Sequence, residues 1–406
     1  MRNQFFSIGL SVTLLGGACS SDSDDTAATG SLTPSPSSSA GGTGNQTPAD
    51  EGNGGNTSAP VPSPNAESIS GSEAVDVSGP LDTSGNEDQN ESGNGPSSNA
   101  DADGPPPTAD VGAPPAAAIC PPGPFPTDPL AGAAAPQAVC TGLTFTEGAV
   151  WVAERNTLFF SDILFNNPGA GRILSFTPGG TGCPTFIENA GTNGLVIAPD
   201  GNLLGARHSD RTLTLFNLDT REPTVFVADN GGVPFVSPND IAVRSDGNIY
   251  FTDPDYGLGG AQAAQPPRAY HRDTSGALTV IDEQGNSNGI TLSPDERLLY
   301  LAHLGGNPAV NDVLVFDIDA SGAPVNPRPF ITGGGSDGMG IDCAGNLYIT
   351  QNGAVVVFAP DGTMIGSIAA PQAANVAFGG PERRTLFITA GPNLLATELA
   401  IPGLMY

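Results

Sequence analysis

The chain has 406 residues, with 42 acidic residues against 13 basic ones and a formal net charge of −29. All of the basic residues are Arg, since the sequence contains no Lys. This excess of acid argues against a nucleic-acid partner, because phosphate backbones are bound by basic surfaces. It favours a negative field that can hold a cation.

Residues 1–19 have the pattern of an export signal. Arg2 is the only positive charge, the stretch from Phe5 to Leu15 is mostly apolar, and small residues precede Cys19. The apolar run is too short to span a bilayer and is typical of a signal h-region. Cys19 after small residues resembles a bacterial lipoprotein processing site, so we predict that Cys19 is lipidated. Ordinary secretion after a nearby cleavage is the alternative.

Residues 20–118 form a low-complexity segment rich in Ser, Gly, Asn, Pro, Thr, Ala and Asp. It contains fifteen acidic residues and no basic one, with almost no aromatic or branched apolar side chains. Such a segment cannot bury enough surface to offset its chain entropy, so we predict a disordered tether. The expected location is a bacterial cell envelope, as a lipoprotein of the outer membrane or periplasm, or the medium outside the cell. Contact with a membrane is expected only through the lipid anchor.

The folded domain is predicted to span residues 119–406, and it carries a repeat. In each copy a polar residue is followed ten or eleven residues later by a residue of a strand. The polar residues, which recur in steps of 38 to 49 residues, are Glu147, Asn193, Asn239, Asn288, Asp337 and Asn375. The matching strand residues are Leu158, Leu203, Ile249, Leu299, Leu347 and Leu386. Turn residues separate the short strands and long 3.6-residue periods are lacking, which argues against helical repeats.

Units of roughly 40–50 residues with several short strands are typical of propeller blades. The sequence therefore predicts an all-β fold, a six-bladed β-propeller. Equivalent positions of successive blades point to one axis, so the six polar residues should meet at one end of the channel. The alternative is that Asn, Asp and Gly are simply turn formers, which fits Glu147 poorly.

Four Cys remain after Cys19, namely Cys120, Cys140, Cys183 and Cys343. An even number in an exported domain predicts disulfides, and the spacing matches no zinc motif. Three pairings are possible. Cys183 falls in the first repeat and Cys343 in the fifth, which are not neighbours in a ring, and Cys120–Cys140 is the first choice.

Several phrases resemble one known family. They are Thr146-Glu147-Gly148-Ala149-Val150-Trp151, Ser237-Pro238-Asn239-Asp240, Ser287-Asn288-Gly289-Ile290 and Ser336-Asp337-Gly338-Met339. In this order they resemble the gluconolactonase / senescence-marker-protein-30 / regucalcin-like family, and the likeness covers nearly all of 140–400. The chain departs from the pattern at Ala149, Ser287 and Ser336, where Pro is usual. These substitutions flank the matching polar residues and put loop rigidity in doubt.

The resemblance implies a divalent metal in the channel, held by Glu147, Asn239, Asn288 and Asp337. It also implies hydrolysis of lactones, and relatives with the same fold hydrolyse organophosphates. The residues themselves point the same way, since an all-oxygen set without His or Cys suits Ca²⁺, with Mg²⁺ and Zn²⁺ as weaker alternatives. Such a metal could polarise a lactone carbonyl while water attacks it.

Asp337 is the preferred general base for that water, although a base that is also a ligand is a compromise. His208 is a second catalytic candidate, because relatives often carry a His there; a structural role is the alternative. Candidate substrate contacts are Asn193, Arg207, Asp253 and Tyr256. We expect a monomer that acts on a small lactone. The alternatives are a non-enzymatic binding platform and an organophosphate hydrolase, because a propeller fold alone decides neither.

Overall fold

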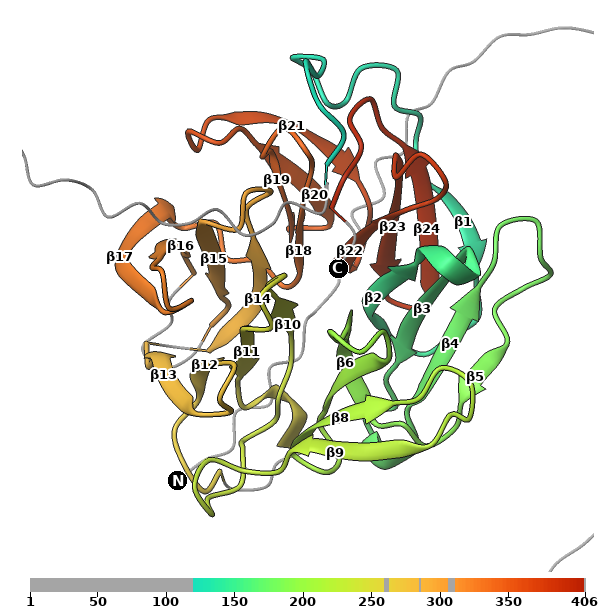
Figure 1. Ribbon diagram of the computed structural model, residues 1–406. Helices are drawn as coiled ribbons and strands as arrows, with labels where there is room; N and C mark the ends of the chain where they lie inside the picture. The colour runs from blue at the N-terminus through green and yellow to red at the C-terminus, as the bar shows by residue number, and fades with distance from the viewer. Residues whose placement is uncertain (1–119, 259–262, 285, 306–310, 405–406) are drawn as a thin grey trace, which may run out of the picture. The chain divides into compact units, whose positions relative to one another are not determined.

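The computed structural model describes residues 120–258, 263–284, 286–305 and 311–404. They form six four-stranded antiparallel sheets in a ring around a central channel, so the predicted six-bladed propeller is confirmed (Figure 1). Among these residues, no helix is long and apolar enough to cross a membrane. The predicted signal peptide, with Cys19, and the predicted tether lie outside the described residues.

Each blade is built from strands consecutive in the chain, numbered from the channel outward. Blades one to three consist of β2 (Thr146–Val152), β3 (Thr157–Asp162), β4 (Arg172–Phe176) and β5 (Thr185–Ile187); β6 (Thr192–Ile197), β7 (Leu203–Arg207), β8 (Thr212–Phe216) and β9 (Pro223–Val227); and β10 (Ile241–Val243), β11 (Ile249–Asp253), β12 (Arg268–Arg272) and β13 (Leu278–Asp282).

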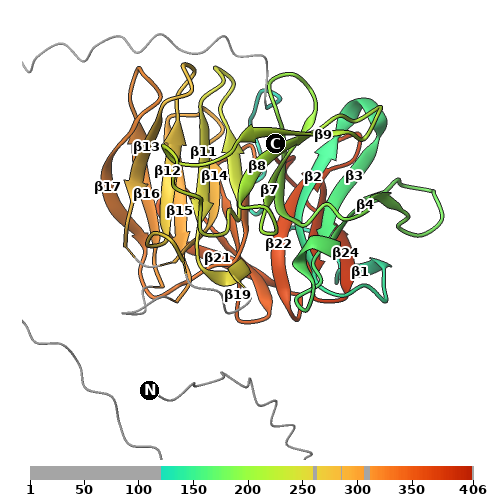
Figure 2. The same cartoon turned by 90° about the horizontal axis from the view of Figure 1, so that it is seen from below.

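The other half of the ring follows the same plan. Blades four to six consist of β14 (Ser287–Leu292), β15 (Leu298–His303), β16 (Val313–Ile318) and β17 (Pro324–Ile331); β18 (Met339–Ile341), β19 (Leu347–Gln351), β20 (Ala354–Phe358) and β21 (Met364–Ala369); and β22 (Ala373–Gly379), β23 (Thr385–Ala390), β24 (Asn393–Glu398) and β1 (Gln137–Cys140). Three short 3₁₀ turns lie in the loops, η1 (Ala153–Arg155), η2 (Pro168–Ala170) and η3 (Tyr256–Leu258). Seen from the side, the strands run along the channel (Figure 2).

The ring closes through β1, which pairs antiparallel with β24 as the outermost strand of blade six. Two disulfides strengthen this region. Cys140 at the end of β1 pairs with Cys183 of blade one, with Cα atoms 6.0 Å apart, and Cys120 pairs with Cys343 of blade five, with Cα atoms 5.5 Å apart. The predicted Cys120–Cys140 pair is therefore wrong. Closure places Cys140 at the seam with blade one, whereas the segment that begins at Cys120 contacts blade five.

The hydrophobic core consists of six layers, each shared by two neighbouring blades. Between blades two and three, for example, Leu204 and Leu213 pack with Ile249, Phe251 and Tyr270. Every blade buries both of its faces, so its strands read as apolar runs and not as a strict alternation. Because no blade has a core of its own, the ring is stabilised as a whole.

Close contact between the innermost strands fixes where the strands begin. The Ser161 hydroxyl of β3 donates to the carbonyl of Asn193 in the next blade at 2.6 Å, and Thr252 of β11 donates to the carbonyl of Asn288 at 2.7 Å. At Gly148 a Cβ atom would lie 2.1 Å from the carbonyl oxygen of Asn193. A glycine after the polar residue thus lets the inner strands approach.

Candidate functional site

A cavity of about 330 Å³ lies at the end of the channel where the innermost strands begin. Its polar side chains come from five different blades; they are Glu147, Asn193, His208, Asn239, Asn288 and Asp337. Apolar side chains and one Tyr complete the wall; they are Phe145, Ile163, Phe165, Pro168, Leu304 and Tyr256. Five of the six repeated polar residues therefore meet at one cavity, as the sequence predicts.

All four predicted metal ligands line this cavity. Glu147 lies in β2 and Asn288 in β14, while Asn239 and Asp337 lie just before β10 and β18. Glu147, Asn239 and Asn288 are almost fully buried, and Asp337 is intermediate in exposure. Gly148 N–H donates to Glu147 Oε2 at 3.1 Å, and the amide of Asn288 hydrogen-bonds to Asp337.

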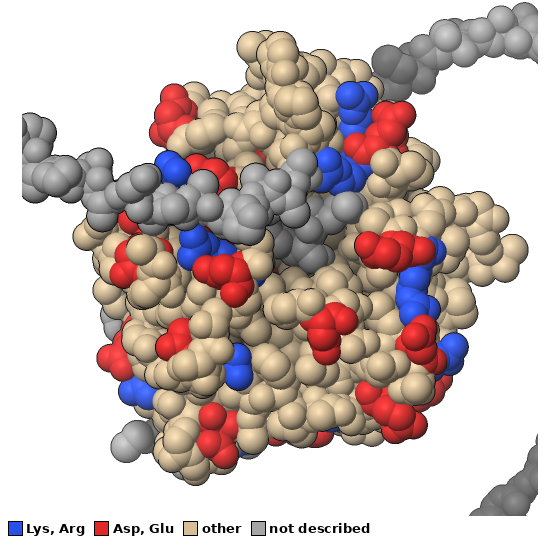
Figure 3. All heavy atoms as spheres, viewed as in Figure 1, with Lys and Arg blue, Asp and Glu red and all other residues tan. Residues whose placement is uncertain are grey.

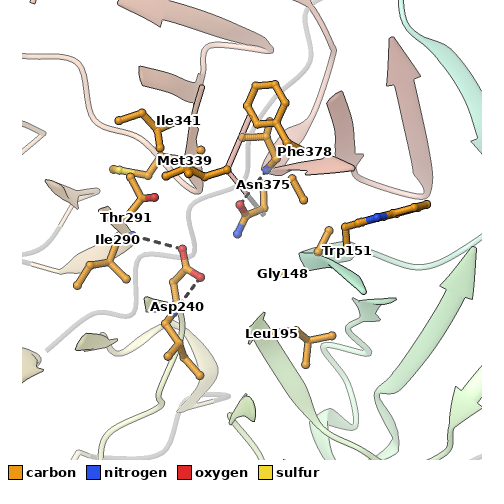
Figure 4. Close-up of a pocket in the computed structure, with 16 residues that line it drawn as sticks. Gly148, Trp151, Leu195, Asp240, Ile290, Thr291, Met339, Ile341, Asn375 and Phe378 are labelled. Carbon is orange, nitrogen blue, oxygen red and sulfur yellow. Dashed lines mark hydrogen bonds between the residues drawn. The ribbon is translucent and has the colours of Figure 1, made fainter. Parts of the chain in front are cut away.

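A second, smaller cavity of about 40 Å³ lies further along the same strands. Figure 4 shows Asp240 and Asn375 there, facing each other across the channel among apolar residues. The carboxylate of Asp240 accepts the N–H of Ile241 at 3.0 Å and that of Ile290 at 3.3 Å. Leu404, near the end of the described chain, lines this cavity too.

Asn375 connects the two cavities. Its Oδ1 accepts the N–H of Val376 at 2.8 Å, which orients the amide. The same side chain hydrogen-bonds to both Glu147 and Asp240. Gly338 leaves room for it, because a Cβ atom there would lie 2.2 Å from Asn375 Cγ. Asn375 thus joins the predicted ligand Glu147 to a carboxylate deeper in the channel.

Three acids share this part of the channel, and burial is the main influence on each of them. Burial raises the pKa of Asp337 to about 7; the hydrogen bond from Asn288 opposes the rise and the charge of Asp240 adds to it. Burial raises the pKa of Asp240 to about 7, against hydrogen bonds from Ile241, Ile290 and Asn375.

For Glu147, burial and then the charge of Asp337 raise the pKa well above its usual range. None of the groups that shift these three pKa values is basic.

The donor set fits a hard divalent cation. Three buried carboxyl groups without a basic partner are costly when ionised, and a cation of charge two would offset that cost. Two carboxylates and two amide oxygens are ligands that Ca²⁺ accepts in flexible geometry. Among the described residues, no three His, Cys, Asp or Glu side chains are grouped as a metal site, so two of the four donors here must be amides.

His208 and Tyr256 line the cavity on its other side. Burial lowers the pKa of His208 to about 4, so the imidazole is neutral at neutral pH. Its Nε2 is buried and has no hydrogen-bond partner in the structure, which leaves it available to a ligand. The hydroxyl of Tyr256 donates to the carbonyl of Leu304.

Two of the predicted substrate contacts lie outside the cavity wall. Arg207 Nε donates to the carbonyl of Ala190 at 2.7 Å, and its Nη1 pairs with Asp210 at 2.5 Å. Asp253 accepts the N–H groups of Val236 and Ser237 at 2.8 and 2.7 Å. Both side chains are held by backbone partners, and Asp253 thereby fixes the segment that leads to Asn239.

Sequence reasoning assigned no role to Asp240, Asn375 or the apolar wall. Asp240 stands where Glu147, Asn193, Asn288 and Asp337 are each followed by Gly, and this exception was a usable signal. Asn375 was counted in the ring without a function. The wall residues Phe145, Ile163 and Phe165 flank a recognised motif but belong to no repeat of their own.

Residues 145–391 match the family described as SMP-30/Gluconolactonase/LRE-like region. The chain belongs to this family. Its members include a gluconolactonase of Zymomonas mobilis, which is 32% identical over 287 residues that cover 64% of this chain and 80% of that protein. The resemblance found in the motifs is confirmed.

Solved structures agree with this membership. A gluconolactonase structure from Xanthomonas campestris has a TM-score of 0.57 and 29% identity, over 64% of this chain and 88% of that one. Regucalcin from Agrobacterium tumefaciens, described as a calcium-binding protein, has a TM-score of 0.56 and 21% identity, over 67% of this chain and 95% of that one. The second likeness concerns the fold alone.

Proposed function

We propose that this chain is a metal-dependent lactone hydrolase of the gluconolactonase type. One observation carries the proposal: Glu147, Asn239, Asn288 and Asp337 all line one cavity of about 330 Å³. The similarity to the gluconolactonase of Zymomonas mobilis supports the same reaction. The preferred ion is Ca²⁺, because the set is all oxygen and two of its members are neutral amides.

In this proposal the four oxygen ligands hold the ion at the floor of the cavity. The bound cation supplies Lewis-acid polarisation of the lactone carbonyl. The neutral His208 and the amide of Asn193 lie on the same cavity and position the lactone ring.

Asp337 takes a proton from water as the water oxygen bonds to the carbonyl carbon. The ring C–O bond then breaks, and the leaving oxygen takes that proton to give a hydroxy acid. A pKa near 7 without metal makes Asp337 a base of suitable strength.

Turnover of lactones by the metal-loaded chain, with and without chelator, tests the proposal. Chelation should abolish hydrolysis, and dialysis against Ca²⁺ should restore it. The screen includes a phosphotriester, so that the organophosphate alternative is tested alongside. If the loaded chain turns over neither class, the chain is a binding platform and the proposal fails.

We also propose that the protein is exported and anchored through lipidated Cys19. The signal-like pattern of residues 1–19 supports this, and so do two disulfides in the propeller, since disulfides persist in oxidising compartments. Membrane fractionation and mass spectrometry of the mature N-terminus provide the test. A Cys19→Ser variant should leave the membrane fraction, and a parent chain that carries no lipid would refute the anchor.

A further inference from the structure

The wall of the large cavity is apolar above its polar floor. Phe145 and Phe165 pack against each other with ring centroids 5.1 Å apart, and both line the cavity with Ile163 and Leu304. Phe165 is 63% exposed, which is unusual for a Phe. Exposed apolar surface at the edge of a cavity marks a place where an apolar ligand can be buried.

The mouth concentrates such residues. Five large hydrophobic side chains are exposed in the described part of the chain, and two of them, Phe165 and Tyr256, line this one cavity. The other three, Val225, Val233 and Met364, do not. Exposure at the mouth is therefore a property of the site and not of the surface at large.

Polar groups that could bind several hydroxyls are lacking on the described wall. The Tyr256 hydroxyl donates to the carbonyl of Leu304. Arg207 is turned to Ala190 and Asp210, and the amide of Asn286 donates to Asp255 at 2.9 Å. A polyhydroxylated ring would lose its water without gaining partners there, which is costly.

The floor cannot replace the missing partners. Its two carboxylates and two of its amides are the proposed cation ligands, which leaves Asn193 and the unpartnered Nε2 of His208. Two polar groups are enough to orient one ester. They are too few for the four hydroxyls of a hexonolactone.

We propose that the cavity selects lactones with an alkyl or aryl substituent over polyhydroxylated sugar lactones. The substituent lies against Phe145, Phe165, Ile163 and Leu304, while the ester faces the floor. The inference rests on the proposed lactone hydrolysis and involves the same bond changes. What it adds is the chemical class of the substrate.

A series of six-membered lactones tests the selectivity on the metal-loaded full chain. The series is δ-valerolactone, its ethyl-, propyl- and pentyl-substituted forms, and glucono-δ-lactone. Each kcat/KM is divided by the uncatalysed rate constant, because these rings differ in intrinsic reactivity. The ratio should rise roughly fourfold for each methylene that is buried, and glucono-δ-lactone should fall below the pentyl lactone.

A Phe165→Ser variant links the effect to the wall, and the exposure of this side chain makes misfolding a small risk. It should flatten the rise of kcat/KM along the series. Met364→Ser, an equally exposed apolar residue on β21 that does not line the cavity, should keep the parent slope. Alkyl-substituted δ-lactams provide a binding readout without turnover, and their inhibition constants should improve with chain length in the parent and not in Phe165→Ser.

The outcomes separate the two proposals. If glucono-δ-lactone exceeds the pentyl lactone, or if the slope is flat in the parent, the selectivity proposal is overturned and lactone hydrolysis stands. If no lactone is turned over, both fall. An equal loss of slope in Met364→Ser would also overturn the role of the wall.

Discussion

The two cavities of the channel are built from the same innermost strands, yet they differ in size and character. The outer cavity, of about 330 Å³, is lined by carboxylates and amides from the starts of the strands. The inner one, of about 40 Å³, is lined mainly by later residues of those strands, such as Ile290, Met339 and Val376. Position along the strand therefore separates the ligand set from the packed part of the channel.

Asp240 and Asn375 are the exceptions, because they are polar residues of the inner cavity. Their hydrogen bonds reach Glu147 in the outer cavity. The comparison suggests a division of labour, in which the outer end binds and the inner end holds a ligand in place. Charge is arranged the same way elsewhere on the molecule: on the face in Figure 3, acidic and basic side chains are interspersed, and no continuous basic patch is seen.

The largest effect is expected from Glu147→Gln, which removes a carboxylate from the outer cavity. Metal binding and turnover should both be lost. In chelator the variant should unfold at the same temperature as the parent or higher, because it lacks a buried carboxyl group whose pKa is raised. Glu154→Gln, the same change at an exposed position, is the control. A Glu147→Gln chain with parental turnover would contradict the ligand assignment.

Asp337→Asn should come next. It keeps an oxygen donor in the outer cavity and removes the proposed base, so kcat should fall roughly 10²–10⁴-fold while metal occupancy falls less. Occupancy is measured by elemental analysis of the same preparation that is assayed. Parental kcat with metal retained would make Asp337 a ligand only, and His208 would then be the candidate base.

Asn375→Leu tests whether the inner cavity acts on the outer one. Removing the amide that bonds to Glu147 and Asp240 should weaken metal affinity by roughly 10–100-fold, as is usual for groups that orient metal ligands. The pH dependence of affinity should shift as well, since two acids lose the same donor. If affinity and its pH dependence are unchanged and only the melting temperature falls, Asn375 has a packing role alone.

His208→Gln sharpens the contrast between groups that prefer ionisation and groups that resist it. The pKa of His208 is about 4 when folded and near 6.5 when unfolded. Between these values the unfolded chain binds a proton that the folded chain does not, so stability falls as pH drops from 6.5 to 4. The slope is at most about 1.4 kcal/mol per pH unit. Urea unfolding across this window should show a smaller slope in the variant than in the parent.

The smallest effect is expected at Thr291, whose hydroxyl is buried in the inner cavity without a hydrogen-bond partner. Thr291→Val removes the unsatisfied group at nearly constant volume. Stability should stay the same or rise by about 1 kcal/mol, and metal affinity should not change. A large loss of affinity would show that this hydroxyl belongs to the site, against the division drawn here.

The sequence predicted the fold because the repeat is explicit. A polar residue and a strand recur six times, and each copy becomes one blade with its polar residue at the start of the innermost strand. The disulfide pairing could not be obtained the same way. It depends on β1 crossing to blade six, and nothing in the local sequence around Cys140 shows which strand it will join.

The site was predictable where it follows the repeat and not where it depends on loops. Glu147, Asn239, Asn288 and Asp337 meet because equivalent positions converge. Arg207 and Asp253 were misplaced because their partners are backbone groups of neighbouring segments, which carry no sequence signal. The apolar wall escaped notice for the opposite reason: Phe165 looks like any exposed loop residue until Phe145 is beside it.

Calorimetric titration of the chelator-treated chain with Ca²⁺, at pH 6 and at pH 8, tests the central claim most directly. The ligand set predicts one ion per chain. Binding should be tighter at pH 8, because Asp240 and Asp337 have pKa values of about 7 without metal and must ionise. It should be absent in Glu147→Gln at both pH values. No saturable binding at pH 8, or binding that survives in Glu147→Gln, would contradict the account.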